Sequence, residues 1–155
     1  MKNTFSITLL LLSLLILPSS QNSRQKPVLM FDEEGNFRIV QFTDLHFRYN
    51  SYRSDSALAM VTNIIMTEKP DLVVFTGDIV ISKETCSAWN SVIKTMSKTE
   101  VPWAVVLGNH DIEYEMTGKQ ITDMLENTPN SLTSNGPVNL SGNGNYTQEI
   151  RSYVC

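Results

Sequence analysis

The sequence predicts an α/β fold built on a parallel β-sheet. Three short strand-like runs rich in apolar residues lie at 38–42, 72–75 and 103–106, each of the length expected for a buried strand. The two stretches between them carry apolar residues at spacings of three and four, which is typical of amphipathic helices. Strand, helix, strand, helix, strand is the order of a βαβαβ unit, in which right-handed crossovers make the strands parallel.

The N-terminal part of this unit is expected to begin with an edge hairpin. Residues 28–31 and the strand that starts at Phe37 flank a turn-forming segment at 32–36. After the first strand, a helix capped by Ser54 and ended by Pro70 is expected. Its apolar face consists of Ala57, Val61, Ile64 and Ile65.

Two further helices are expected, one from Lys83 to Lys98 and one from Gly118 to Asn127. The segment 130–145 is rich in Asn, Ser and Gly and is expected to be a loop that leads into a strand within 146–153. The apolar stripes of the two helices are Trp89, Val92, Ile93 and Met96 in the first, and Ile121, Met124 and Leu125 in the second.

Polar residues able to bind a metal follow each of the three predicted strands. The clusters begin 34 and 31 residues apart, at positions 44, 78 and 109, which is about the length of one βαβ unit. Because parallel strands end at one edge of a sheet, where ligands bind, we expect a shared site there. The alternative is that the clusters lie on three unrelated loops. In that case the clusters would be more than about 10 Å apart, too far for them to share a metal pair. The residues are Asp44, His46, Asp78, Asn109, His110 and Asp111.

These clusters resemble the first three signature blocks of the calcineurin-like metallophosphoesterases, and their local sequence resembles the purple-acid-phosphatase-like branch. The resemblance covers residues 37–128 and continues more weakly to Tyr146. It implies a four-layer sandwich, of which residues 28–155 would form a partial domain containing the first half. The blocks are Asp44-Leu45-His46, Gly77-Asp78 and Gly108-Asn109-His110-Asp111.

The resemblance also implies the chemistry of the site. In this family two divalent or trivalent ions, drawn from iron, zinc and manganese, clamp a phosphate mono- or diester for hydrolysis. His110 would be catalytic, stabilising the transition state or protonating the leaving group, and Asp111 would orient His110 by accepting a hydrogen bond. By position, the metal ligands would be Asp44 and His46 for the first ion, Asp78 as the bridge, and Asn109 for the second ion.

The sequence departs from the family pattern in its supply of histidines. His110 is the last histidine of the chain, whereas the family takes further histidine ligands from later strands, so the second metal site is expected to be incomplete. Ile81 occupies the position of the tyrosinate that colours the purple members. A truncated phosphoesterase domain is therefore expected, and the alternative is a non-catalytic remnant or metal-binding interaction module.

Surface properties give further expectations about partners. Three strands with two or three helices would leave one sheet face uncovered and available to a protein partner. With 12 basic and 16 acidic residues, the chain has a net charge of −4, which does not favour nucleic acid as a partner.

The first twenty residues indicate export. Lys2 precedes a run of 13 apolar-dominated residues from Phe5 to Leu17, and small residues follow at Ser19 and Ser20. This run is shorter than the ~20 residues of a membrane-spanning helix, so residues 1–20 are interpreted as a secretory signal, with an uncleaved membrane anchor as the alternative.

Two kinds of modification would accompany export. Cys86 and Cys155 are the only cysteines and allow one disulfide. Asn139 and Asn145 each begin a glycosylation acceptor motif.

Overall fold

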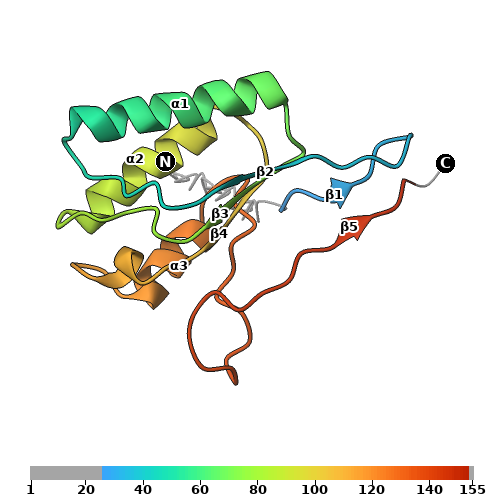
Figure 1. The fold of residues 1–155 in the computed structure, drawn as a ribbon. Helices are drawn as coiled ribbons and strands as arrows, with labels where there is room; N and C mark the ends of the chain where they lie inside the picture. The colour runs from blue at the N-terminus through green and yellow to red at the C-terminus, as the bar shows by residue number, and fades with distance from the viewer. Residues whose placement is uncertain (1–25, 154–155) are drawn as a thin grey trace, which may run out of the picture.

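The computed structural model describes residues 26–153 and contains a central parallel sheet of three strands (Figure 1). The strands are β2 (Ile39–Phe42), β3 (Leu72–Thr76) and β4 (Trp103–Val106), and their order is β2-β3-β4. Each strand lies within one residue of a run predicted from the sequence. The α/β class and the parallel βαβαβ unit are therefore confirmed.

Three helices cover one face of this sheet. α1 (Tyr52–Glu68) connects β2 to β3, α2 (Thr85–Ser97) connects β3 to β4, and α3 (Gly118–Glu126) follows β4. Side chains alternate along β3, so that Val73 and Phe75 face the helices and are fully buried. The apolar stripes of all three helices pack on this face, which holds the main core.

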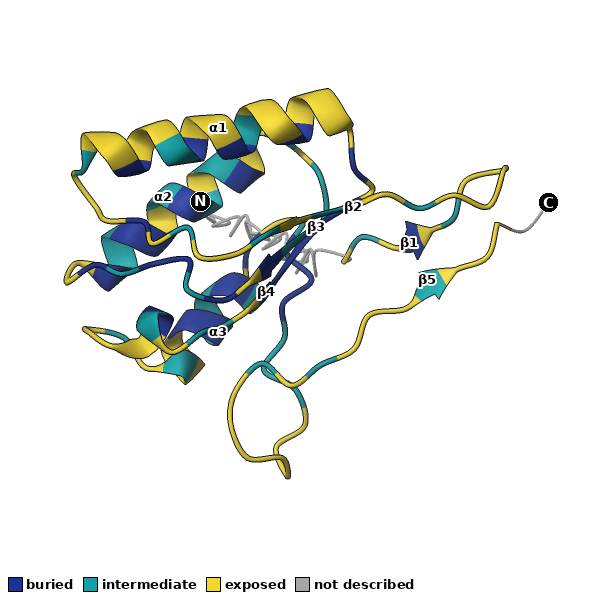
Figure 2. Ribbon diagram, viewed as in Figure 1, coloured by how far each residue is buried: buried dark blue, intermediate teal, exposed yellow. Residues whose placement is uncertain are grey.

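The opposite face of the sheet is partly covered. Its smaller apolar cluster consists of Leu29, Leu72, Ala104 and Leu132, with Phe37, Val74, Tyr146 and Ile150 packed against it. Ile39 and Val106 remain about half exposed, at 51% and 50%. Figure 2 shows buried residues along β3 and β4 and exposed residues along the outward side of α1. The predicted uncovered face is thus covered in part by the segment before β2 and by the segment that follows α3.

The expected N-terminal hairpin is wrong. β1 (Leu29–Met30) pairs in parallel with β5 (Ile150–Arg151) to form a separate two-stranded sheet. The turn at 32–36 does form, because the Asp32 carboxylate accepts hydrogen bonds from the backbone N–H groups of Glu34 and Asn36. Burial of Leu29, which is 4% exposed, in the cluster on the second face favours pairing with the distant strand.

Two details of α1 also differ from the expectation. The helix begins at Tyr52 with Ser51 as its N-cap residue, and Ser54 is buried within its first turn. The Ser54 Oγ accepts a hydrogen bond from the backbone N–H of Arg48 at 3.0 Å, so it serves the preceding loop instead of the helix end. Ile64 is 36% exposed and Leu58 takes its place in the buried stripe.

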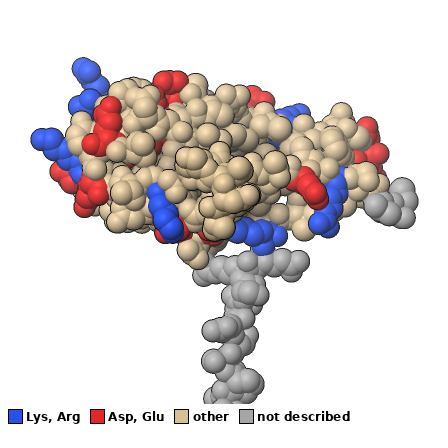
Figure 3. All heavy atoms as spheres, turned by 90° about the horizontal axis from the view of Figure 1, so that it is seen from below, with Lys and Arg blue, Asp and Glu red and all other residues tan. Residues whose placement is uncertain are grey.

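Several expectations concern residues outside the described part of the chain. The proposed signal at 1–20 and Cys155 lie there, and Cys86 is half-buried in α2. Asn139 and Asn145 are both exposed. Within residues 26–153, no helix has the length and hydropathy needed to cross a bilayer. On the face seen in Figure 3, Lys, Arg, Asp and Glu lie mainly around the edge, and the centre is nearly uncharged.

Candidate metal site

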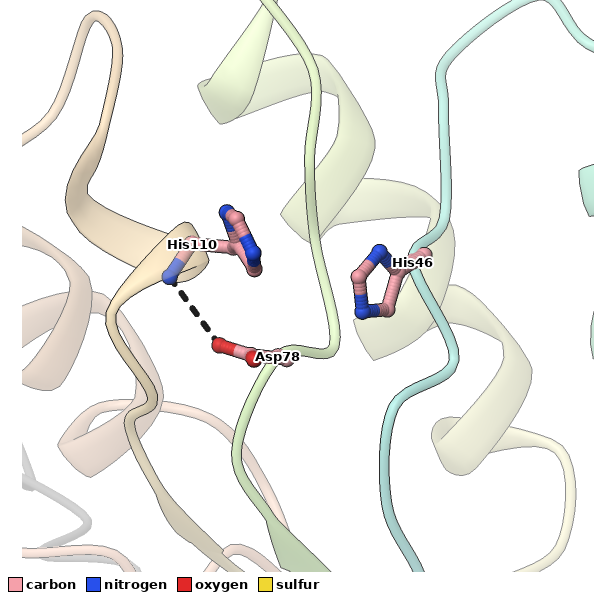
Figure 4. A group of neighbouring side chains, drawn as sticks. All are labelled: His46, Asp78 and His110. Atoms are coloured by element: carbon pink, nitrogen blue, oxygen red, sulfur yellow. Dashed lines mark hydrogen bonds between the residues drawn. The ribbon is translucent and has the colours of Figure 1, made fainter.

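Three potential metal ligands converge at the carboxyl edge of the central sheet (Figure 4). His46 follows β2, Asp78 follows β3 and His110 begins the short 3-10 helix η1 (His110–Ile112) after β4. Each offers a ligand atom, and these three atoms lie within 4.8 Å of one another. This distance excludes three unrelated loops and confirms the expected convergence of the clusters.

The backbone is bent into the left-handed region at the ligand positions. Asp44, His46 and Asp78 have φ angles of 52°, 49° and 54°, although only seven non-glycine residues of the described chain have positive φ. Such conformations are uncommon outside glycine and cost on the order of 1–3 kcal/mol, and they cluster at functional sites. Three of the seven non-glycine residues with positive φ therefore lie at the sheet edge where the candidate ligands meet.

Backbone hydrogen bonds hold the first two loops together beyond the ends of their strands. The N–H of Asp44 donates to the Gly77 carbonyl at 3.1 Å, and the N–H of His46 donates to the Asp78 carbonyl at 3.0 Å. The N–H of Phe47, a fully buried residue, donates to the Ile79 carbonyl at 2.8 Å. The β2–β3 register therefore continues through the site and sets the distance between His46 and Asp78.

The Asp111 carboxylate joins the second loop to the third. It is 1% exposed and accepts four backbone N–H groups at 2.8–3.0 Å, those of Asp78, Ile79, Val80 and Gly108. Burial raises the pKa of this carboxyl, while the four N–H donors act in the opposite direction. Among the described residues, the His110 ring contacts Glu113 and not Asp111, so the orienting role expected of Asp111 stays a prediction.

Glu113 is the residue in contact with the His110 ring. Its Oε1 lies 2.6 Å from Nδ1 of His110, and the backbone N–H of His110 donates to Oδ1 of Asp78 at 3.0 Å. With the proton on Nδ1, the lone pair of His110 Nε2 is available to a metal or a substrate. The signal in the sequence was the i, i+3 spacing, because side chains three apart eclipse in a 3-10 turn.

Asp44 and Asn109, the other two predicted ligands, lie at the rim of the cluster. Oδ1 of Asp44 is 3.6 Å from Nε2 of His46, and its Oδ2 accepts a hydrogen bond from the Thr43 hydroxyl. Asn109 is exposed and immediately precedes η1. The structure thus groups His110 with His46 and Asp78, and the roles of Asp44 and Asn109 stay predictions.

Two glycines allow the second and third loops to approach each other. Gly77 has φ 103°, and a Cβ built there would lie 3.1 Å from Cα of Gly108. A Cβ on Gly108 would lie 2.2 Å from Oδ1 and 2.5 Å from the backbone nitrogen of Asp78. Any side chain at position 108 must therefore displace Asp78.

We expect Gly108→Ala to weaken binding of Zn²⁺ or Mn²⁺ by about tenfold, because a displaced Asp78 no longer meets the two histidines. Loss of the contacts that orient a metal ligand lowers metal affinity by about 10–100-fold. Calorimetric titration with each metal measures this change. The matched control is Gly118→Ala, whose Cβ would come no closer than 3.3 Å to another atom and would leave affinity unchanged. Equal affinities for the two variants would contradict the role of Gly108.

The site geometry agrees with comparisons to known proteins. Residues 37–153 match the sequence model of the family described as Calcineurin-like phosphoesterase. The chain is 29% identical to the probable inactive purple acid phosphatase 29 of Arabidopsis thaliana, over 94% of this chain and 43% of that protein. It is 31% identical to phosphatase DCR2 of Saccharomyces cerevisiae, over 77% of this chain and 24% of that protein. The chain spans less than half the length of these relatives.

Proposed function

The chain belongs to the calcineurin-like phosphoesterase family, and on that premise we propose that it supplies the first half of a metal-dependent site for hydrolysis of phosphate mono- or diesters. The observation that carries the proposal is the convergence of His46, Asp78 and His110 within 4.8 Å. Imidazole nitrogens and a carboxylate suit zinc, iron and manganese. A bound ion would polarise a phosphoryl oxygen and offset the charge that develops on it.

The donor set fits one ion better than two. Three converging donors are one fewer than the four of a tetrahedral zinc site, and the nearby Asp44 carboxylate supplies a further oxygen. Asp78 is placed between the two histidine-bearing loops, as a bridging carboxylate requires. Asn109 would contribute a neutral oxygen to a second ion, whose remaining ligands the described residues do not supply.

His110 is the residue proposed to act on the substrate. Its ring is held on one side by Glu113 and faces the ring of His46, with the two ring centroids 5.2 Å apart. In the Nδ1-protonated form, Nε2 would ligate the ion, whereas a doubly protonated ring would donate to a phosphate oxygen or to the leaving group. Both roles need the His110 ring to point its Nε2 toward the site, and the contact of Glu113 with Nδ1 supports this orientation.

A second candidate function is a metal-binding or interaction module without catalytic activity. Three of the similar Arabidopsis thaliana proteins are named probable inactive purple acid phosphatases. The half-exposed Ile39 and Val106 on the second sheet face would then contact a protein partner. For either function, we propose that residues 1–20 direct export.

Metal removal tests the proposed hydrolysis. We expect the purified chain to hydrolyse an aryl phosphate when Zn²⁺, Mn²⁺ or Fe³⁺ is added, and to lose this activity when a chelator removes the metal. Asp78→Asn serves as the inactive control. Metal binding without hydrolysis above this control would contradict catalysis and support the second candidate. Hydrolysis that survives chelation would contradict a metal-dependent reaction.

A further inference from the structure

An open pocket lies directly beside the candidate metal site, at the start of α1. Its volume is about 420 Å³, within the ~300–1,000 Å³ range of small-molecule sites. His46, one of the three converging residues, forms part of its wall together with Leu45. The pocket therefore adjoins the candidate metal site through His46.

Two arginines give the pocket a positive lining. Arg48 and Arg53 both line it, and no aspartate or glutamate does. Neither arginine forms an ion pair with any residue in the described part of the chain. In a chain whose net charge is −4, this is a local concentration of unneutralised positive charge next to the site.

The backbone that carries the two arginines is held in place, while both side chains are exposed. The N–H of Arg48 donates to the buried Ser54 Oγ, and the N–H of the next residue, Tyr49, donates to Ser82 Oγ at 3.2 Å. Arg53 belongs to the first turn of α1, one residue before Ser54. An ordered backbone lowers the entropy cost of binding at these two positions, and the exposed side chains would become ordered together with the ligand.

From these observations, and resting on the proposed function, we propose that the pocket binds a second phosphate group of the substrate, with Arg48 and Arg53 as the residues that recognise it. Guanidinium groups make bidentate, charge-assisted hydrogen bonds to phosphate, and two of them balance a phosphate dianion. The preferred substrate is then a small molecule that carries two phosphates, one at His46 and Asp78 and one in the pocket.

The test compares binding of fructose 1,6-bisphosphate and fructose 6-phosphate to the zinc-loaded chain by calorimetry. We expect wild type to bind the bisphosphate about tenfold or more tightly than the monophosphate. The double variant Arg48→Met/Arg53→Met should lose this preference. The control Lys98→Met/Arg151→Met removes the same charge away from the pocket and should keep the preference. A preference that is absent in wild type, or equal in the two double variants, would overturn the proposal.

A titration of the metal-free chain with inorganic phosphate separates this proposal from the proposed function. Phosphate should bind wild type and Lys98→Met/Arg151→Met equally, and bind Arg48→Met/Arg53→Met at least about tenfold more weakly. That result supports the pocket even if the metal-loaded chain hydrolyses nothing. Phosphate binding that is unaffected by loss of the arginines would overturn it even if hydrolysis is observed.

Discussion

Replacing Asp111 by alanine will lower the free energy of unfolding by about 3–5 kcal/mol, because four backbone N–H groups, two of them fully buried, lose their common acceptor. The variant leaves the backbone N–H groups of Asp78, Ile79, Val80 and Gly108 without their acceptor. Each unsatisfied buried donor costs about 1–3 kcal/mol, and the sum is reduced where water enters the space that the side chain leaves. Urea unfolding followed by circular dichroism measures the change.

Asp123→Ala is the control for this effect. The partly exposed Asp123 of α3 pairs with Lys119 at 2.7 Å and accepts a hydrogen bond from Asn135 at 2.7 Å, and interactions of these kinds contribute about 1 kcal/mol each. If Asp111 acted by orienting His110, its replacement would lower activity and leave stability close to that of the Asp123 variant. Equal stabilities of the two variants would therefore contradict the structural role assigned to Asp111.

Asp78→Asn is expected to weaken binding of Zn²⁺ or Mn²⁺ by about 100-fold or more and to reduce any hydrolysis in proportion. The substitution removes the only carboxylate among the three converging residues. The neutral amide that replaces it lacks the negative charge with which a carboxylate binds these cations. The fold should persist, because the amide oxygen of asparagine can still accept the N–H of His110. Calorimetric titration and urea unfolding of the same sample measure both quantities.

The matched control for the Asp78 variant is Asp55→Asn. Asp55 is an exposed carboxylate in the first turn of α1, outside the converging group, and its replacement makes the same chemical change. Metal affinity should stay at the wild-type value in this variant. An Asp78→Asn protein that binds metal as tightly as the Asp55→Asn protein would contradict the ligand role of Asp78.

The sequence predicted the parallel sheet and the meeting of the three clusters because both follow from local patterns. Apolar runs set the strands, and strands that run in the same direction end at the same edge. By contrast, pairing of Leu29 with Ile150 joins residues 121 positions apart through strands of two residues each. Such pairing depends on which surface buries the apolar side chains, and neither short segment carries a periodicity that reveals its partner.

The features of the site that the sequence did not reveal have a related physical cause. Asp111 binds backbone N–H groups, which every residue except proline possesses, so the sequence does not indicate which ones will surround a carboxylate. Ser51 and Ser54 are both suitable caps for α1, and the contact of Ser54 with the Arg48 backbone decides between them. Glu113 was detectable from its spacing to His110 only once a 3-10 turn was expected there.

The most direct test of the central claim is an anomalous-scattering map from crystals of the chain soaked with Zn²⁺ and recorded at the zinc absorption edge. The convergence of His46, Asp78 and His110 predicts a peak among these three residues, at about 2.0–2.2 Å from a histidine nitrogen and an Asp78 oxygen. A map with zinc bound at other residues and no peak within this group would contradict the claim.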